Sequence, residues 1–98
     1  MAQIIDLTAS QELPADCYIY KHSTRCPISA SVARTLRKFE TDLPIYWINC
    51  LESPAISDWV AHKYHVEHET PQLIKVQEGK VVNTLAHYFI SDRNLQKA

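Results

Sequence analysis

The sequence predicts one α/β domain, residues 1–98, in which a central mixed sheet carries helices on both faces. Two observations lead to this fold class. Short apolar, β-branched runs alternate with segments whose apolar residues recur every three or four positions, which is the order of a βαβ unit with a parallel strand pair. The last third of the chain holds two extended runs around Gly79, the only glycine, and this predicts an antiparallel hairpin. The expected order of elements is βα-βαβα-ββα.

The N-terminal region is expected to supply a strand, a brief helix and a second strand. Residues 3–7 predict a short strand, and the segment from Thr8 to Gln11 has capping-box spacing for a brief helix that Pro14 would end. The segment "CYIYK", 17–21, is short, aromatic and β-branched, as expected of a buried strand.

The clearest helical pattern begins at Cys26. Pro27 suits the first helical turn, where its missing N–H costs nothing. Basic residues gather toward the C-terminal half, where the helix dipole favours cations. The apolar residues are spaced by four, four and three, which places them on one helical face: Ile28, Val32, Leu36 and Phe39.

The next strand and helix repeat this order. The segment "LPIYWIN", 43–49, predicts a second buried strand. Ser53 and Pro54 predict the start of a helix, with Ser53 as its N-cap and Pro54 at its first position. This helix carries a second apolar stripe, formed by Ile56, Trp59, Val60 and Tyr64.

The C-terminal third predicts the hairpin and a last helix. The hairpin strands are residues 70–77 and 80–86. Ser91 can cap a terminal helix, in which Ile90 and Leu95 have the spacing of a hydrophobic staple.

Composition and charge exclude several functional classes. An apolar share of 46% with 21% charged residues is that of an ordinary globular chain. A net charge of −1, with no cluster of Lys or Arg, gives no electrostatic footprint for nucleic acid. The sequence shows no apolar run of about eighteen residues and no basic-then-apolar leader, so we expect a soluble, unexported protein. Three cysteines at spacings of 9 and 24 outline neither a disulfide framework nor a zinc knuckle, which favours the cytoplasm.

Cys26 is the candidate for chemistry, because "KHSTRCPIS" leads from a strand directly into a helix. The N–H groups of a first helical turn have no partner within the helix and carry partial positive charge, which stabilises a thiolate. At such positions the pKa of cysteine falls from about 8.5 to roughly 3.5–7.5, and the thiolate is the form that attacks disulfides. Arg25, Lys21 and His22 would add positive charge nearby. A cysteine that only fills a gap in the core is the alternative, and the conjunction of strand, Cys-Pro and helix favours the reactive thiol.

The other two cysteines receive different interpretations. Cys17 begins an apolar strand and is expected to be a buried structural thiol. Cys50 follows the strand 43–49 at the sheet edge where Cys26 should emerge. A role for Cys50 as a resolving thiol is conceivable, but the spacing between neighbouring strands and the helix start opposes it.

The histidines give no convincing metal site. They recur every three residues at His62, His65 and His68, but the helix is expected to end near Tyr64 and no carboxylate or cysteine completes a ligand set. We expect a solvated helix end and no bound metal. His87 has no evident partner, and His22 either tunes the charge of Cys26 or serves packing and solvation.

Three features together resemble the thioredoxin fold: the order of elements, Cys-Pro-Ile-Ser at the start of the first long helix, and Thr70-Pro71 before the hairpin. The strings "KHSTRCPIS" and "TPQLIKVQEGKVV" are most similar to the YtxJ-like bacilliredoxins, small monothiol thioredoxin-fold proteins of bacteria that use bacillithiol. The resemblance extends from about Ile4 to Gln96.

The resemblance implies a thiol-disulfide oxidoreductase with a thioredoxin-like fold, in which Cys26 is the nucleophile. Pro71 would be a cis-proline beside it, and Thr70 would offer backbone groups to an incoming peptide or thiol. Ser29 would occupy the position of the resolving cysteine, so that Cys26 would transfer a small thiol and not reduce protein disulfides as a dithiol. The expected substrate-binding residues are completed by Thr24, Arg25 and Pro27.

The resemblance further implies no bound cofactor, bacillithiol as a co-substrate, and thiolated client proteins as partners, with neither nucleic acid nor a membrane. The glycine pair that glutathione-type glutaredoxins carry after the hairpin is missing, so glutathione is disfavoured. One alternative is a non-catalytic thioredoxin-like module that binds a client beside Pro71 and uses Cys26 as a redox sensor. Iron–sulfur assembly is disfavoured because the sequence lacks Cys-Gly-Phe-Ser.

Overall fold

The protein is built on one mixed sheet, with strands in the order β1-β3-β2-β4-β5. The structure, a computed structural model, describes residues 3–24, 27–87 and 90–97. β1 and β2 run parallel to β3, whereas β4 is antiparallel to both β2 and β5. The described residues contain strands β1 (Ile4–Asp6), β2 (Cys17–His22), β3 (Ile45–Asn49), β4 (Gln72–Gln77) and β5 (Lys80–Ala86), and helices α1 (Pro27–Lys38), α2 (Pro54–Tyr64) and α3 (Asp92–Lys97). The predicted α/β class with a mixed sheet is confirmed.

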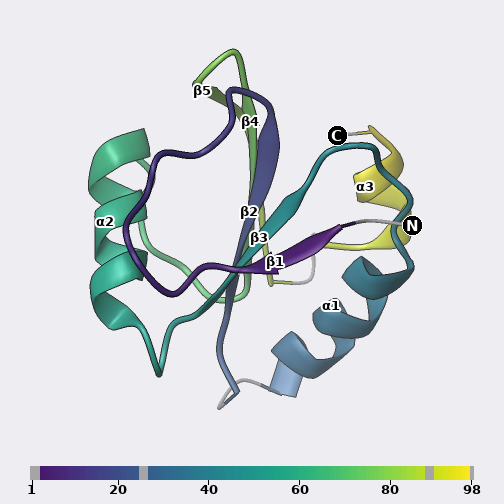
Figure 1. The fold of residues 1–98 in the computed structure, drawn as a ribbon. Coiled ribbons are helices and arrows are strands. Elements are labelled where there is room, and N and C mark those ends of the chain that lie inside the picture. Colours follow the sequence, from purple (N-terminus) through teal and green to yellow (C-terminus); the bar gives the residue numbers. More distant parts are fainter. Residues whose placement is uncertain (1–2, 25–26, 88–89, 98) are drawn as a thin grey trace.

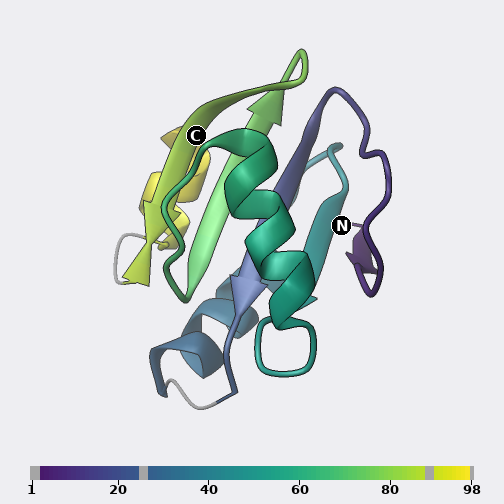
Figure 2. The same ribbon diagram turned by 90° about the vertical axis from the view of Figure 1, so that its left-hand side faces the viewer.

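The sheet has a core on each face because side chains alternate along its strands. On β2, Ile19 faces α2 and packs in one cluster with Ile56 and Val60. Its neighbours Tyr18 and Tyr20 face the other way and pack in a second cluster with residues of α1 and α3. Figure 1 shows α2 on one side of the sheet and α1 and α3 on the other, and Figure 2 shows α2 lying across its face. Helices therefore cover both faces, as predicted.

Local sequence signals set the ends of α2. Pro54 is at the start of the helix, but Ser53 before it makes no side-chain capping hydrogen bond. The helix ends at Tyr64, where His65 adopts the left-handed conformation (φ 55°) and donates its N–H to the carbonyl of Ala61. The predicted helix end near Tyr64 is confirmed.

The hairpin turn and the last helix form where the sequence predicts them. Glu78 and Gly79 both have positive φ, at 54° and 76°, as a tight two-residue hairpin turn requires. Ser91 accepts a hydrogen bond on its Oγ from the N–H of Asn94 over 3.3 Å, which is the predicted N-cap. Ile90 and Leu95 are both buried in the cluster on the α1 face.

The brief helix predicted between Thr8 and Gln11 is wrong. Residues 7–16 form an irregular segment that follows β1. Leu7 is buried, with its N–H bonded to the carbonyl of Trp47 over 2.9 Å, and Leu13 packs against the core on the α2 face. A helix of one turn is marginal by itself, and here the burial of two leucines determines the path of the chain.

Within residues 3–24, 27–87 and 90–97, none of the helices has the length and apolar content that crossing a bilayer requires.

Candidate functional site

The C-terminal ends of β2 and β3 and the N-terminal end of β4 lie at the same end of the sheet. β2 and β4 are antiparallel and place Lys21 opposite Gln72, so His22 and Pro71 each lie one residue beyond that pair. Cys50 follows β3 and donates its backbone N–H to the carbonyl of His22 over 2.9 Å. Figure 1 shows this end of β2 close to the start of α1. The segment around Thr70-Pro71 and the start of α1 thus belong to the same end of the molecule.

Cys26, the nucleophile expected from the sequence, and Arg25, an expected binding residue, lie outside the described residues. Their flanks are described. Thr24 is exposed after the end of β2, and Pro27 is exposed at the first position of α1. In chain order Cys26 directly precedes this helix of 12 residues, whose first turn carries partial positive charge.

Ser29 lies in the first turn of α1 with 0% of its surface exposed. Its Oγ has no hydrogen-bond partner among the described residues. The position is three residues after Cys26, where a dithiol motif would carry its second cysteine. The first turn of α1 therefore offers a hydroxyl where a dithiol protein would offer a second thiol.

The Thr70–Pro71 peptide bond is cis, as the family resemblance implied. Pro71 is buried, and its carbonyl already accepts a hydrogen bond from the N–H of His87 over 3.0 Å. Thr70 is half-buried, and its backbone groups make no hydrogen bond to other described residues. Among the described residues, the backbone of Thr70 therefore has no partner, whereas the carbonyl of Pro71 does.

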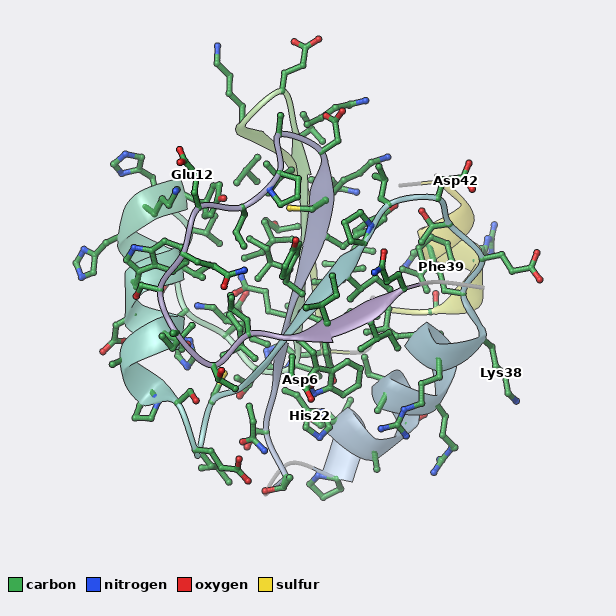
Figure 3. The ribbon with its side chains drawn as sticks, viewed as in Figure 1. Asp6, Glu12, His22, Lys38, Phe39 and Asp42 are labelled. Carbon is green, nitrogen blue, oxygen red and sulfur yellow. The ribbon has the colours of Figure 1, made fainter. Side chains whose placement is uncertain are left out.

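The two basic residues at the end of β2 face opposite sides of the sheet. His22 faces α1, where its Nδ1 lies 3.0 Å from the hydroxyl of Tyr20 and its ring centroid lies 5.1 Å from that of Trp47. Burial lowers the pKa of His22, and the nearby Arg37 lowers it further, so its ring favours the neutral form. Figure 3 shows His22 at the lower end of the sheet, beside α1. Of the two roles considered for His22, packing is the one that these contacts support.

Lys21 points the other way, toward α2, and is fully buried. Burial lowers the pKa of its ammonium group. The expected contribution of Lys21 and His22 to positive charge near Cys26 stays a prediction, because Cys26 lies outside the described residues; His22 favours its neutral form, and Lys21 lies on the α2 face of the sheet.

A cavity of about 310 Å³ lies on the α1 face of the sheet, beside the first turns of α1. His87, one of its walls, also places its Nε2 3.7 Å from Oε1 of Glu69, so this side chain connects the cavity with the Thr70-Pro71 bend. The sequence had suggested no partner for His87, and that expectation is wrong. The cavity is lined by Ile28, Ser31, Val32, Thr35, His87, Ile90 and Ser91.

The two described cysteines differ in their surroundings. Cys17 is completely buried, and its burial raises the pKa of the thiol from 9.0 to about 11, which confirms the predicted structural thiol. Cys50 is half-buried at the sheet edge. In the described part of the chain, no group of three or more His, Cys, Asp or Glu side chains could hold a metal ion. His68 instead lies within hydrogen-bond distance of Lys21 and Ser57.

Comparison with known protein families assigns the chain to one of them. The family model for BrxC, described as the monothiol bacilliredoxin, matches residues 2–95. The chain belongs to the monothiol bacilliredoxin family. The resemblance found in the sequence is therefore confirmed, and family membership makes the protein a thiol-disulfide oxidoreductase.

Solved structures confirm the thioredoxin-like fold. A structure described as a candidate oxidoreductase with a thioredoxin fold superposes with a TM-score of 0.86 at 29% identity, covering 96% of this chain and 91% of the other. Thioredoxin from Aeropyrum pernix has a TM-score of 0.65 at 23% identity, covering 85% of this chain and 72% of its own. Reduced thioredoxin from Schistosoma mansoni gives 0.69 at 15% identity, with 91% and 90% covered. At such identities the two thioredoxins support the fold alone.

Proposed function

We propose that the protein removes a low-molecular-weight thiol, bacillithiol, from mixed disulfides on protein cysteines, with Cys26 as the nucleophile. The observation that carries this proposal is the pairing of two features at one end of the sheet. The first is a helix that begins immediately after Cys26 in the chain and holds a buried Ser29, not a second cysteine, in its first turn. The second is the Thr70-Pro71 bend, where the backbone of Thr70 makes no hydrogen bond to another described residue.

The chemistry follows from the single thiol. The thiolate of Cys26 attacks the small-thiol sulfur of the mixed disulfide, so a new S–S bond forms while the S–S bond to the client breaks. The client cysteine leaves as a thiolate and takes a proton from solvent. Because Ser29 cannot attack a disulfide, the adduct on Cys26 persists until a second small thiol or a separate reductant displaces it. No net oxidation occurs in the first step, and the small thiol is transferred.

The described residues provide places for both halves of the substrate. An extended client segment can pair with the backbone of Thr70 in the manner of an added strand. The small thiol can occupy the cavity beside α1, whose volume is at the lower end of the range of about 300–1,000 Å³ for ligand sites. Thr24 and Pro27 are exposed where they can border this site. Bacillithiol acts here as a co-substrate with no bound cofactor, and thiolated cytoplasmic proteins are the proposed partners.

The test follows the mass of a client protein that carries one bacillithiol adduct. The native protein should return the client to its unmodified mass, whereas the Cys26→Ala variant should leave the adduct in place. Cys17→Ala is the matched control, because it removes a buried thiol of the core and should retain the activity. Undiminished removal by Cys26→Ala would reject the assignment.

A second measurement separates catalysis from a client-binding module that only senses redox state. The pH dependence of alkylation at Cys26 gives the pKa of its thiol. A pKa above about 8 would leave too little thiolate for rapid exchange at neutral pH and would favour the binding module.

A further inference from the structure

Two basic side chains meet on the α2 face of the sheet. Lys21 of β2 is 0% exposed, and its Nζ lies 3.1 Å from Nδ1 of His68. His68 belongs to residues 65–71, the connection between α2 and β4 that contains the cis peptide bond. β2 leads along the chain toward Cys26. The contact therefore joins the strand that leads to the proposed nucleophile with the connection that holds the cis-proline bend.

The two nitrogens of this contact can share one proton, but they cannot both be fully protonated. An ammonium group donates hydrogen bonds and accepts none, so a charged Lys21 needs a neutral His68 whose Nδ1 presents its lone pair. With the roles reversed, a neutral Lys21 amine accepts from Nδ1–H. When both groups are charged, each nitrogen is a donor, and two cations lie 3.1 Å apart with Lys21 shielded from water. The contact is therefore stable only while at least one of the two groups is neutral.

Ser57 of α2 does not replace Lys21 in this contact. Its Oγ lies 3.0 Å from the same Nδ1, which has one lone pair, so Ser57 and Lys21 compete to donate to a neutral ring. A protonated ring can donate from Nδ1 to Ser57, because a hydroxyl oxygen also accepts. A charged Lys21 has no such alternative with His68. Protonation of the ring thus permits its bond to α2 but removes its bond to β2.

The groups around His68 favour its neutral form at pH 7. Burial, followed by Lys21, lowers the pKa of His68, and Asp58 of α2 and Glu69 oppose this with smaller effects. Burial also lowers the pKa of Lys21, while Cys50 and Asp58 oppose that shift. A released His68 would titrate near the ordinary value of about 6.5. Because the folded pKa is lowered, the contact is fully present above about pH 6.5 and weakens as the pH falls from there toward the lowered value.

Two other side-chain attachments hold the connection in the described part of the chain, and neither weakens between pH 7 and about pH 5. Gln72 donates from Nε2 to the carbonyl of Glu67 over 3.0 Å, a bond without a titratable group. Glu69 lies 3.7 Å from His87, and protonation of His87 strengthens this pair. Both side chains are about half exposed, so the pair contributes little. Among these attachments, the contact with Lys21 is the one that acid weakens.

We propose that Lys21 and His68 are positioning residues, whose hydrogen bond fixes the Thr70-Pro71 bend relative to β2 and is lost when both are protonated. Thiol transfer depends on this placement, because a client would pair with the bend while β2 leads to the sulfur that attacks. A fall in pH should therefore slow the reaction by more than the loss of Cys26 thiolate explains. The proposal rests on the function proposed for Cys26, and its test separates the two.

Variants of the full chain distinguish a positioning role from a structural one. The rate of bacillithiol removal from a client is measured between about pH 5 and pH 8, where the denaturant midpoint of each variant shows that it is folded. Lys21→Met and His68→Ala each remove the hydrogen bond and should slow the reaction about fivefold at pH 7.5. Met fills the position of a buried lysine without a charge, so the fold should persist. His68→Asn offers an amide oxygen near the place of Nδ1, which accepts from Lys21 without titrating, so it should retain the rate at pH 7.5.

The pH profile decides between the two roles. Each pH unit below about 6.5 favours the released connection by up to about tenfold, until the lowered pKa of His68 is reached. The rate advantage of the native protein over Lys21→Met should therefore fall below about twofold by pH 5, whereas that of His68→Asn should persist. His65→Asn is the matched control: it alters an exposed histidine in a left-handed position that Asn tolerates, and its profile should equal the native one. A constant ratio of the native rate to that of Lys21→Met across this range would overturn the proposal.

Nuclear magnetic resonance gives a readout that does not need thiol transfer. In the native protein, the ring of His68 should titrate below about 6.5, and the backbone amide of Thr70 should shift with the same midpoint. Lys21→Met should raise the pKa of His68 and reduce the shift of Thr70, because the ring then gains its charge without breaking a contact. If the native protein removes no bacillithiol, the function proposed for Cys26 fails, and these titrations still decide whether the contact places the bend. A Thr70 amide that does not follow the titration of His68, or a His68 pKa that Lys21→Met leaves unchanged, would contradict the assignment.

Discussion

The Ser29→Ala substitution is expected to stabilise the protein. Ser29 is completely buried in the first turn of α1, and its hydroxyl has no partner among the described residues. A buried hydroxyl without a hydrogen bond costs about 1–3 kcal/mol, and alanine also favours the helix by up to about 0.5 kcal/mol. Loss of packing around the removed oxygen offsets part of this gain. The net expectation is about 1 kcal/mol of added stability, or roughly 4–8 °C in Tm for a domain of this size.

Urea unfolding measures this effect as an upward shift of the midpoint with an unchanged slope. Ser31→Ala is the matched control, because Ser31 is exposed on the same helix and reports helix propensity alone, with a change within about 0.5 kcal/mol. A Ser29→Ala variant that is less stable than the parent would refute the reasoning, since it would show that the hydroxyl has a partner whose loss costs more than its burial.

Three further predictions concern the core, a cap and the response to alkaline pH. Ser91→Ala removes the 3.3 Å cap to Asn94 and should cost about 1 kcal/mol by urea unfolding; an unchanged midpoint would contradict this. Leu36→Ala empties a fully buried position of α1 and should cost about 2–5 kcal/mol, so a loss below about 1 kcal/mol would show that the position is not part of the core. The pKa of Cys17 rises from 9.0 to about 11 on folding, so the folded state holds its proton more tightly and stability is lost as pH rises through that window, by no more than about 3 kcal/mol. Cys17→Ala should lose this part of the alkaline destabilisation, and identical pH profiles for the two proteins would rule it out.

The features that the sequence predicted correctly depend on contacts between near neighbours in the chain. The spacing of Val32 and Leu36 gives one helical face whatever that face packs against, and both residues are buried. The cap at Ser91 requires only a donor three residues later. The turn at Gly79 requires only a residue that tolerates positive φ. Such signals are complete within a few residues, and they therefore survive in the folded chain.

The features that could not be predicted from the sequence depend on the register of strand pairing across the sheet. The hairpin turn pairs Gln77 with Lys80, and a regular ladder continued from there would place Pro71 opposite Ala86. An irregularity between Lys75 and Val76 shifts the ladder by one residue, so that His87 and not Ala86 meets Pro71. The sequence did not predict the contact between His87 and the Thr70-Pro71 bend for this reason, because no local sequence pattern indicates the bulge.

The alternation of side chains along β2 places its two basic residues, Lys21 and His22, on opposite faces of the sheet. Adjacent residues of a strand point to opposite sides, so Lys21 and His22 cannot both act on one sulfur through their side chains. His22 lies on the α1 face, where its ring packs against Trp47, and Lys21 lies on the α2 face, where its Nζ is within hydrogen-bond distance of His68. A sequence shows the alternation, but only the packing of the two helices shows which environment each side chain enters.

The two helices also separate the position of a resolving thiol from Cys50. Ser29 in α1 leaves the first turn of that helix without a thiol, whereas Cys50 packs with the core on the α2 face, where its Sγ lies 3.6 Å from Oγ of Ser57. Burial raises the pKa of the Cys50 thiol, which keeps the sulfur protonated and slow to attack a disulfide. We therefore expect that Cys50 does not resolve a mixed disulfide on Cys26. Excess small disulfide should give an adduct on Cys26 that persists equally in the native protein and in Cys50→Ser, as measured by intact mass. An internal disulfide between Cys26 and Cys50 that replaces this adduct in the native protein would contradict the expectation.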